Sequence, residues 1–138
     1  MAIRMELARI LIRENHPSHI IELREVEGNR KFAIEIGRYE AAAIERRLSG
    51  RPVSRPQTHE LLASVIEQMG GAIEKVIVND LVHDEQGNGT FLARLMIRQD
   101  GKIVDIDSRP SDAIALGIAN EVPIFVASHV LEEVGKTE

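Results

Sequence analysis

Two short segments bring together the residue types that hydrolytic chemistry uses. The first, SRPQTHELL, holds His59 and Glu60, and the second, DSRPSDAIAL, holds Arg109 and Asp112. A histidine can act as a general base, and carboxylates are ligands that suit Mg²⁺ and Mn²⁺. Each segment is therefore a candidate for proton transfer or for metal binding.

The first segment also has a purely structural explanation, which we favour on these residues alone. Thr58 would cap a helix, Glu60 would complement the positive end of its dipole, and His59 would lie in the solvated first turn. The pattern is not the zinc-protease motif H-E-x-x-H, because residue 63 is alanine.

Most polar residues of the second segment likewise fit the start of a helix. Asp107 or Ser108 would be the N-cap, and Asp112 would favour the positive end of the dipole. Arg109 is the exception, because a cation in a first turn is unfavourable without a partner. An ion pair with Asp105 or Asp112 is the favoured explanation, and a phosphate contact is the alternative.

Arginines are concentrated at and before these helix starts. Arg55 and Arg109 each precede a proline and a predicted helix, and a helix start flanked by arginine can bind an anion. Between residues 38 and 55 there are five arginines and two acids, a basic strip that could contact phosphates. The arginines are Arg38, Arg46, Arg47, Arg51 and Arg55, and the acids are Glu40 and Glu45.

Hydrophobic spacing predicts the elements that must position these residues. Strands are expected at 5–15, 19–26, 31–36, 72–84, 89–99, 102–107 and 122–126, and helices at 37–50, 58–69, 108–119 and 128–134. The second helix should bury an apolar stripe of Leu61, Leu62, Val65, Ile66 and Met69.

The chain also looks internally duplicated. At an offset of 70, Ile34, Ile36, Ala43, Ile44 and Leu48 fall on Val104, Ile106, Ala113, Ile114 and Ile118. Each half reads as three strands and a helix, which predicts an α+β fold with a mixed β-sheet and helices packed on one side of it.

Composition limits the function classes. A chain of 138 residues fits one domain, without cysteine there is no disulfide or thiolate chemistry, and no apolar run is long enough to span a membrane. The net charge of −5 argues against a surface that coats nucleic acid, and Tyr39 is the one aromatic side chain outside the strand-like runs. We expect a cytoplasmic protein.

Three strings, IEIGRYEAAAIERRLSG, RPQTHELL and DSRPSDAIALGIANEVPIFVASHVLEEVG, resemble the bifunctional nuclease domain family. The resemblance covers about residues 7–135 of a single domain at 1–138. The family is mostly bacterial and was long classed as a domain of unknown function, while plant members are assigned DNase and RNase activity. The matching positions are Gly37, Glu40, Arg55, Pro56, Thr58, His59, Glu60, Asp107, Arg109, Pro110, Ser111 and Asp112.

This resemblance implies a compact α+β homodimer with a duplicated half. Many relatives have Asp where this chain has Glu60, which keeps the carboxylate and lengthens its reach. Many also carry a short C-terminal module known from excision-repair proteins, and we expect this chain, which ends at Glu138, to lack it.

The leading hypothesis is a metal-assisted phosphodiesterase acting on DNA and RNA. His59 would activate water, Arg55 and Arg109 would clamp the phosphate, and acids would hold Mg²⁺ or Mn²⁺. The predicted metal ligands are Glu60, Asp107 and Asp112, which must converge, and the predicted substrate-binding residues are Arg38, Arg55, Thr58 and Ser111.

Two other hypotheses remain open. In the first, the chain is a non-enzymatic module that binds an anion, a nucleotide or an acidic protein segment, which needs no metal. In the second, the RPSD string has a structural role only: it fixes the junction between the sheet and the helix, and it stabilises the dimer.

Overall fold

The computed structural model describes residues 1–137, which form one mixed sheet of seven strands together with four α-helices. This confirms the α+β class. The strands are β1 (Ala2–Leu11), β2 (Ser18–Glu25), β3 (Lys31–Gly37), β4 (Gly71–His83), β5 (Gly89–Gln99), β6 (Lys102–Ser108) and β7 (Ile124–Ala127). The helices are α1 (Arg38–Ser49), α2 (Thr58–Gln68), α3 (Pro110–Gly117) and α4 (Ser128–Val134), with a 3₁₀ turn, η1, at Ile118–Asn120.

The strand order β3-β2-β1-β7-β4-β5-β6 displays the predicted duplication. Strands β1, β2 and β3 form one antiparallel meander, and β4, β5 and β6 form a second. Between them lies β7, antiparallel to β1 and parallel to β4. A helix follows each meander directly, α1 after β3 and α3 after β6, so the two halves repeat one unit.

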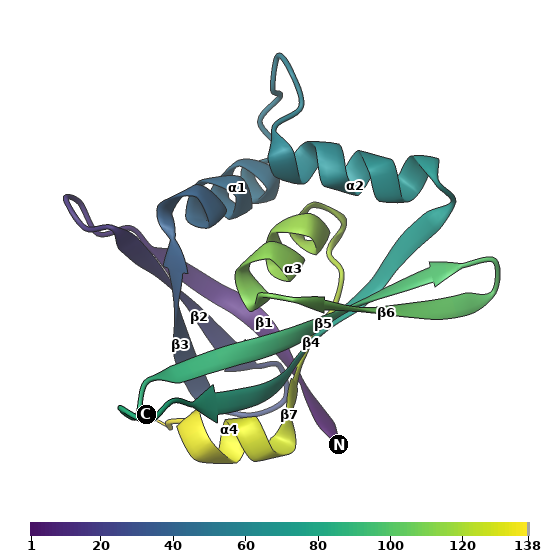
Figure 1. Ribbon diagram of the computed structural model, residues 1–138. Coiled ribbons are helices and arrows are strands. Elements are labelled where there is room, and N and C mark those ends of the chain that lie inside the picture. Colours follow the sequence, from purple (N-terminus) through teal and green to yellow (C-terminus); the bar gives the residue numbers. More distant parts are fainter. Residues whose placement is uncertain (138) are drawn as a thin grey trace.

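Helix α3 is the centre of the core. Seven of its eight residues are buried, and Asp112 is the exception. Figure 1 shows α3 inside the curve of the sheet, with α1 and α2 above it and α4 at the opposite end. The expected placement of helices on one side therefore holds for α1, α2 and α3, while α4 closes the other end with Val130 and Leu131 buried.

The two halves differ at their outer strands. Ile34 and Ile36 of β3 are buried, whereas their counterparts in β6, Val104 and Ile106, are each 40% exposed. Both strands are sheet edges, but β3 is covered by the second meander, where the Phe32 and Phe91 rings meet at a centroid distance of 5.6 Å. The apolar side chains of β6 are not covered in this way.

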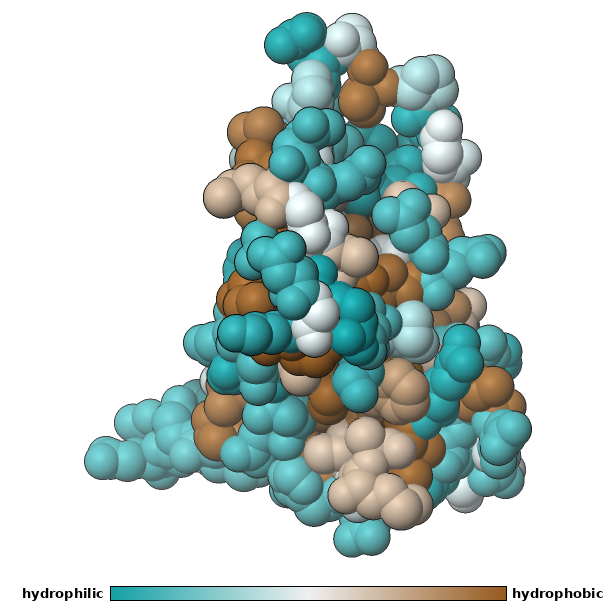
Figure 2. All heavy atoms as spheres, turned by 90° about the vertical axis from the view of Figure 1, so that its right-hand side faces the viewer, coloured by the Kyte–Doolittle hydropathy of each residue, from teal (hydrophilic) through white to brown (hydrophobic). Residues whose placement is uncertain are grey.

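Helix α2 buries less than its apolar stripe predicts. Ala63 and Ile66 pack against the core, but none of its residues is fully buried. Together with β6, it leaves an outer apolar surface, which consists of Leu61, Leu62, Val65, Met69, Val104 and Ile106. Figure 2 shows hydrophobic side chains among hydrophilic ones on the side toward which α2 and the β5–β6 hairpin point.

The predicted helix caps are wrong in two places. α2 is capped at Gln57 and not at Thr58, and the Gln57 N–H donates to Glu60 Oε1 at 3.2 Å. α3 begins at Pro110 after an extended Arg109, so neither Asp107 nor Ser108 caps it. The proline explains this start, because its ring suits the first helical position and keeps the preceding residue extended.

Among residues 1–137, no helix has both the length and the apolar character needed to cross a membrane.

Candidate functional site

Three helices bring four polar side chains into one hydrogen-bonded cluster. His59 Nε2 of α2 lies 2.8 Å from Asp112 Oδ1 of α3, and Arg109 Nε donates to Asp112 Oδ2 at 2.9 Å. Arg109 also donates to Glu40 Oε2 of α1 at 3.3 Å. Asp112 is thus the centre of the cluster and holds a histidine on one oxygen and an arginine on the other.

The local sequence explains why Asp112 and Arg109 meet. They are three residues apart at the start of α3, a spacing at which side chains on one helical face are neighbours. The ion pair confirms one of the two partners expected for Arg109, and the carboxylate of Asp112 raises the pKa of the Arg109 guanidinium. The other expected partner, Asp105, pairs instead with Arg94 at 2.7 Å.

The cluster forms one wall of an open groove of about 660 Å³ between α2, α3 and the β5–β6 hairpin. The groove is lined by both apolar and polar side chains. Its apolar lining includes Leu62, Leu92, Leu95, Ile106 and Leu116, and its polar lining includes Glu40, Thr58, His59, Asp107, Ser108, Arg109 and Asp112.

This arrangement is chemically competent for proton transfer. A carboxylate only accepts hydrogen bonds, so the contact with Asp112 places the proton of neutral His59 on Nε2 and leaves Nδ1 as an acceptor. The His59 side chain is 13% exposed, which holds the ring in place, whereas Arg109 is 63% exposed and open to a ligand.

Glu60 does not belong to this cluster. Both of its oxygens bind Arg46, at 2.8 and 3.0 Å, in a forked ion pair that joins α2 to α1. The hydrogen bonds from Arg46 hold the pKa of Glu60 below its usual value of 4.5. Sequence reasoning did not foresee Arg46 as its partner, because the two residues lie in different helices.

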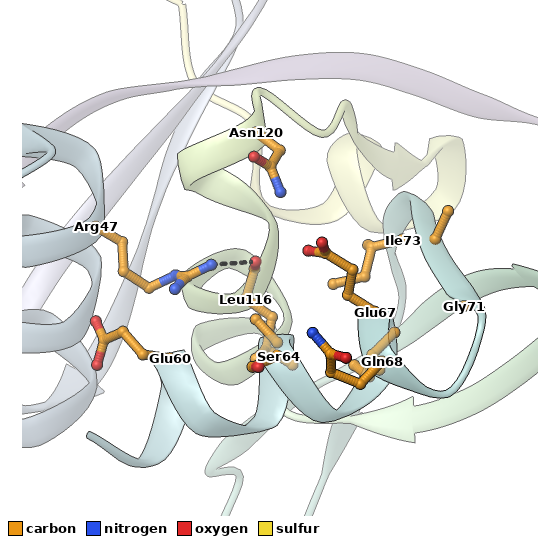
Figure 3. Close-up of a pocket in the computed structure, with 12 residues that line it drawn as sticks. Arg47, Glu60, Ser64, Glu67, Gln68, Gly71, Ile73, Leu116 and Asn120 are labelled. Carbon is orange, nitrogen blue, oxygen red and sulfur yellow. Dashed lines mark hydrogen bonds between the residues drawn. The ribbon is translucent and has the colours of Figure 1, made fainter. Parts of the chain in front are cut away.

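Glu60 lines a different pocket, of about 530 Å³, between α2, the end of α3 and the start of β4 (Figure 3). In that pocket Arg47 donates to the carbonyl oxygens of Ala115 and Leu116, at 2.6 and 3.0 Å, and so satisfies the end of α3. The predicted trio of Glu60, Asp107 and Asp112 is therefore not brought together. Within residues 1–137, no group of three or more histidine and acidic side chains is arranged to hold a metal ion.

The other predicted site residues are distributed over three places. Thr58 and Asp107 line the groove, with the Asp107 side chain 79% exposed. Ser111 is 5% exposed and, with Arg109, lines a neighbouring pocket. Arg55 is exposed in the loop between α1 and α2, away from the groove.

Arg55 and Arg109 are therefore not equivalent members of the repeat. The structural counterpart of α3 is α1, whereas Arg55 precedes α2. Arg38, at the start of α1, lines a pocket on the opposite face of that helix from Glu40.

Glu40 is the cluster member that residue chemistry alone missed. It appeared among the motif positions, but its meeting with Arg109 spans 69 residues and depends on how α1 packs against α3.

Comparison with known proteins gives one family. The sequence profile of the bifunctional nuclease domain matches residues 21–138. An uncharacterised protein of Mycobacterium tuberculosis is 35% identical over 122 residues, which cover 88% of this chain and 68% of that protein.

Two plant proteins are more distant. Bifunctional nuclease 1 of Oryza sativa subsp. japonica is 27% identical over 116 residues, which cover 83% of this chain and 34% of the rice protein. Bifunctional nuclease 2 of Arabidopsis thaliana is 28% identical over 78 residues, or 56% of this chain and 23% of that protein. The matched region is thus about a third or less of each plant protein.

Proposed function

Because the chain belongs to the bifunctional nuclease domain family, we propose that it is a phosphodiesterase acting on DNA and RNA and that the groove is its active site. The observation that carries this proposal is the pairing of His59 with Asp112 at 2.8 Å, beside the exposed Arg109. A base held by a carboxylate, next to a guanidinium, can activate water and stabilise the charge that develops on a phosphate, and both effects promote phosphodiester hydrolysis.

Each residue has a distinct role in this proposal. His59 Nδ1 takes the proton from the attacking water. Asp112 fixes the orientation of the imidazole and stabilises it once it is protonated. Arg109 binds a non-bridging phosphate oxygen, for which its planar guanidinium is suited. Thr58 and Ser108 line the same groove and offer hydroxyl groups to the substrate.

Charge supports the proposed dependence on Mg²⁺ or Mn²⁺. Glu40, Asp107 and Asp112 line the groove together with Arg109. Arg94 adjoins the groove through its ion pair with Asp107 at 3.7 Å, but it also pairs with Asp105. The carboxylates therefore outnumber the guanidinium groups around the groove, and a cation that accompanies an incoming phosphate reduces the repulsion. The residues do not form a complete metal cage. Mg²⁺ is often held by only one or two protein carboxylates together with phosphate oxygens of the substrate, and the groove residues suit this mode of binding. Bound in this way, the ion would neutralise charge on the phosphate.

The test is cleavage of labelled single- and double-stranded DNA and RNA in Mg²⁺, Mn²⁺ or EDTA. His59→Gln should lower the rate by about 100-fold or more, because it removes the base. Asp112→Asn should lower it by about 100-fold, because the imidazole loses its orientation. Glu67→Gln, on the other side of α2, is the matched control and should cleave like the wild type.

Cleavage that survives both groove substitutions in folded protein contradicts the assignment of the active site. Cleavage in EDTA that equals cleavage in Mg²⁺ contradicts the role of the metal. If no nucleic acid is cut under any condition, the non-enzymatic anion-binding module replaces the nuclease.

We also propose that the chain is a homodimer formed through the outer apolar surface. Strand β6 is a sheet edge with free backbone groups and exposed Val104 and Ile106, a combination that natural proteins cover. A second copy there would also border the groove, because Leu62 and Ile106 line it.

A further inference from the structure

A second concave surface lies on the opposite side of α1 from the groove. This arginine pocket, of about 490 Å³, is formed by α1, the ends of β1 and β2 and the loop after α1. Its polar lining is Arg38, Arg46, Arg51, His19 and Glu45. It gathers three of the five arginines of the basic strip.

Hydrogen-bond donors in the pocket remain available to a ligand. Within residues 1–137, Arg38 has no ion pair with a carboxylate; its guanidinium lies 5.7 Å from the centre of the Tyr39 ring. Arg51 pairs with Glu45 through one nitrogen at 3.1 Å, and both side chains are more than half exposed, so this pair is weak and easily exchanged.

His19 adds a fixed donor. Its Nδ1 accepts a hydrogen bond from the Arg13 backbone N–H at 3.0 Å, which places the proton of the neutral ring on Nε2. Even after Glu45 and Glu60, the partner of Arg46, are counted, the three arginines leave the pocket positive on a chain whose net charge is −5.

The arginine pocket and the groove are joined by the first turn of α1. Successive helical residues are rotated by about 100°, so Arg38 and Glu40 lie on nearly opposite faces and Tyr39 lies between them. Glu40 lines the groove, and Tyr39 is 74% exposed. A chain that leaves the pocket and crosses Tyr39 therefore reaches the side of the groove where Glu40 pairs with Arg109.

We propose that the arginine pocket binds a backbone phosphate of a single-stranded nucleic acid whose next base stacks on Tyr39 and whose following phosphate enters the groove. Guanidinium groups match the geometry of phosphate oxygens, and an exposed ring accepts any unpaired base. This inference rests on the proposed nuclease function and assigns the path by which its substrate approaches.

Binding is measured by fluorescence anisotropy of a labelled single strand of about ten nucleotides in Mg²⁺, at several salt concentrations. The intact chain carrying His59→Gln is used, so that cleavage does not interfere. When Arg38→Gln and Arg51→Gln are both introduced into this variant, binding should weaken about tenfold, because charge-assisted hydrogen bonds are lost. The slope of log affinity against log salt should fall by about 0.7 for the lost phosphate contact. Tyr39→Leu should weaken binding at least about fivefold through lost stacking.

The matched control is Arg24→Gln. Arg24 is an exposed arginine of β2 that pairs with Glu6 of β1 and does not line the pocket. Affinity unchanged in the double variant, or lowered equally by Arg24→Gln, overturns the inference. The inference is also overturned if inorganic phosphate binds the pocket but the double variant still binds the strand normally. The pocket would then be a site for free phosphate. A failure of the nuclease proposal is distinguishable, because the strand would then bind through the pocket without being cut by the wild type.

Discussion

At the scale of single residues, Asp112 has the most consequential position. It is the one residue of α3 that is not buried, and each of its oxygens has a different partner. Arg109, for which the sequence favoured an ion pair over a phosphate contact, is held by Asp112 and Glu40 but remains 63% exposed. Ion pairs with such exposure add little stability, so these contacts position the guanidinium and do not hold the fold together.

The ion pair of Glu60 with Arg46 is less exposed than that of Arg109, and its contribution to stability can be tested by varying the pH. Its lowered pKa means that the ion pair with Arg46 stabilises the folded state above the usual carboxyl pKa of 4.5. This contribution is lost as pH falls through the lower pKa of the folded state. At pH 7, Glu60→Gln should reduce the free energy of unfolding by about 2 kcal/mol, from lost charge-assisted hydrogen bonds.

Urea unfolding at pH 7 and at successively lower pH measures this difference. The gap between Glu60→Gln and the wild type should shrink below pH 4.5, while Glu67→Gln on the same helix should show no gap at either pH. A gap that is constant with pH would contradict the ion pair as its cause.

At the scale of elements, the packing of α3 sets the position of the whole cluster. The helix is short and buried, and its C-terminal Gly117 lies against Val122 in the connection to β7. A Cβ atom added at Gly117 would lie 2.8 Å from Val122 Cβ, closer than normal carbon contacts allow. The connection can follow α3 so closely only because this position lacks a side chain.

Gly117→Ala should therefore destabilise the protein by about 1 kcal/mol or more, because overpacking exceeds the roughly 1 kcal/mol that alanine gains in a helix. Thermal unfolding monitored by circular dichroism measures this change. In a Val122→Gly background the same substitution should become neutral or stabilising, since the Val122 Cβ atom that the added methyl group meets is then absent. An equal cost in both backgrounds would contradict the close approach as the cause.

The α2 helix and strand β6 show how far local pattern alone can mislead. Both have the apolar spacing of buried elements, yet α2 has no buried residue and β6 has none either. Leu62 and Ile106 line the groove, and the apolar side chains that make up the outer apolar surface remain 40% or more exposed in residues 1–137. The homodimer proposal gives that surface a partner.

At the scale of the whole molecule, light scattering with size-exclusion chromatography tests the dimer. The wild type should have twice the chain mass of 15.4 kDa. Val104→Asp introduces a charge at the centre of the exposed β6 and should shift the mass to that of a single chain at micromolar concentration. Val82→Asp, at a similarly exposed position on β4, is the control and should remain dimeric.

A wild type that is monomeric at every concentration contradicts the dimer. A Val104→Asp variant that stays dimeric places the interface on another surface.

The sequence by itself determined the elements of this protein and their duplication. The seven strands, the four helices and the repeat at an offset of 70 all follow from apolar spacing, glycine and proline, which act within a few residues of one another. The same local signals placed His59, Arg109 and Asp112 at helix starts and suggested that Arg109 pairs with Asp112.

Only the tertiary structure decided which helix starts meet. His59 and Asp112 are 53 residues apart, and Arg109 and Glu40 are 69 apart, so no local spacing relates them. The structure also separated Glu60 from the other acids, because Arg46 of the neighbouring helix binds both of its oxygens. Contacts of this kind depend on how α1, α2 and α3 pack over a curved sheet, and that packing is a property of the whole core.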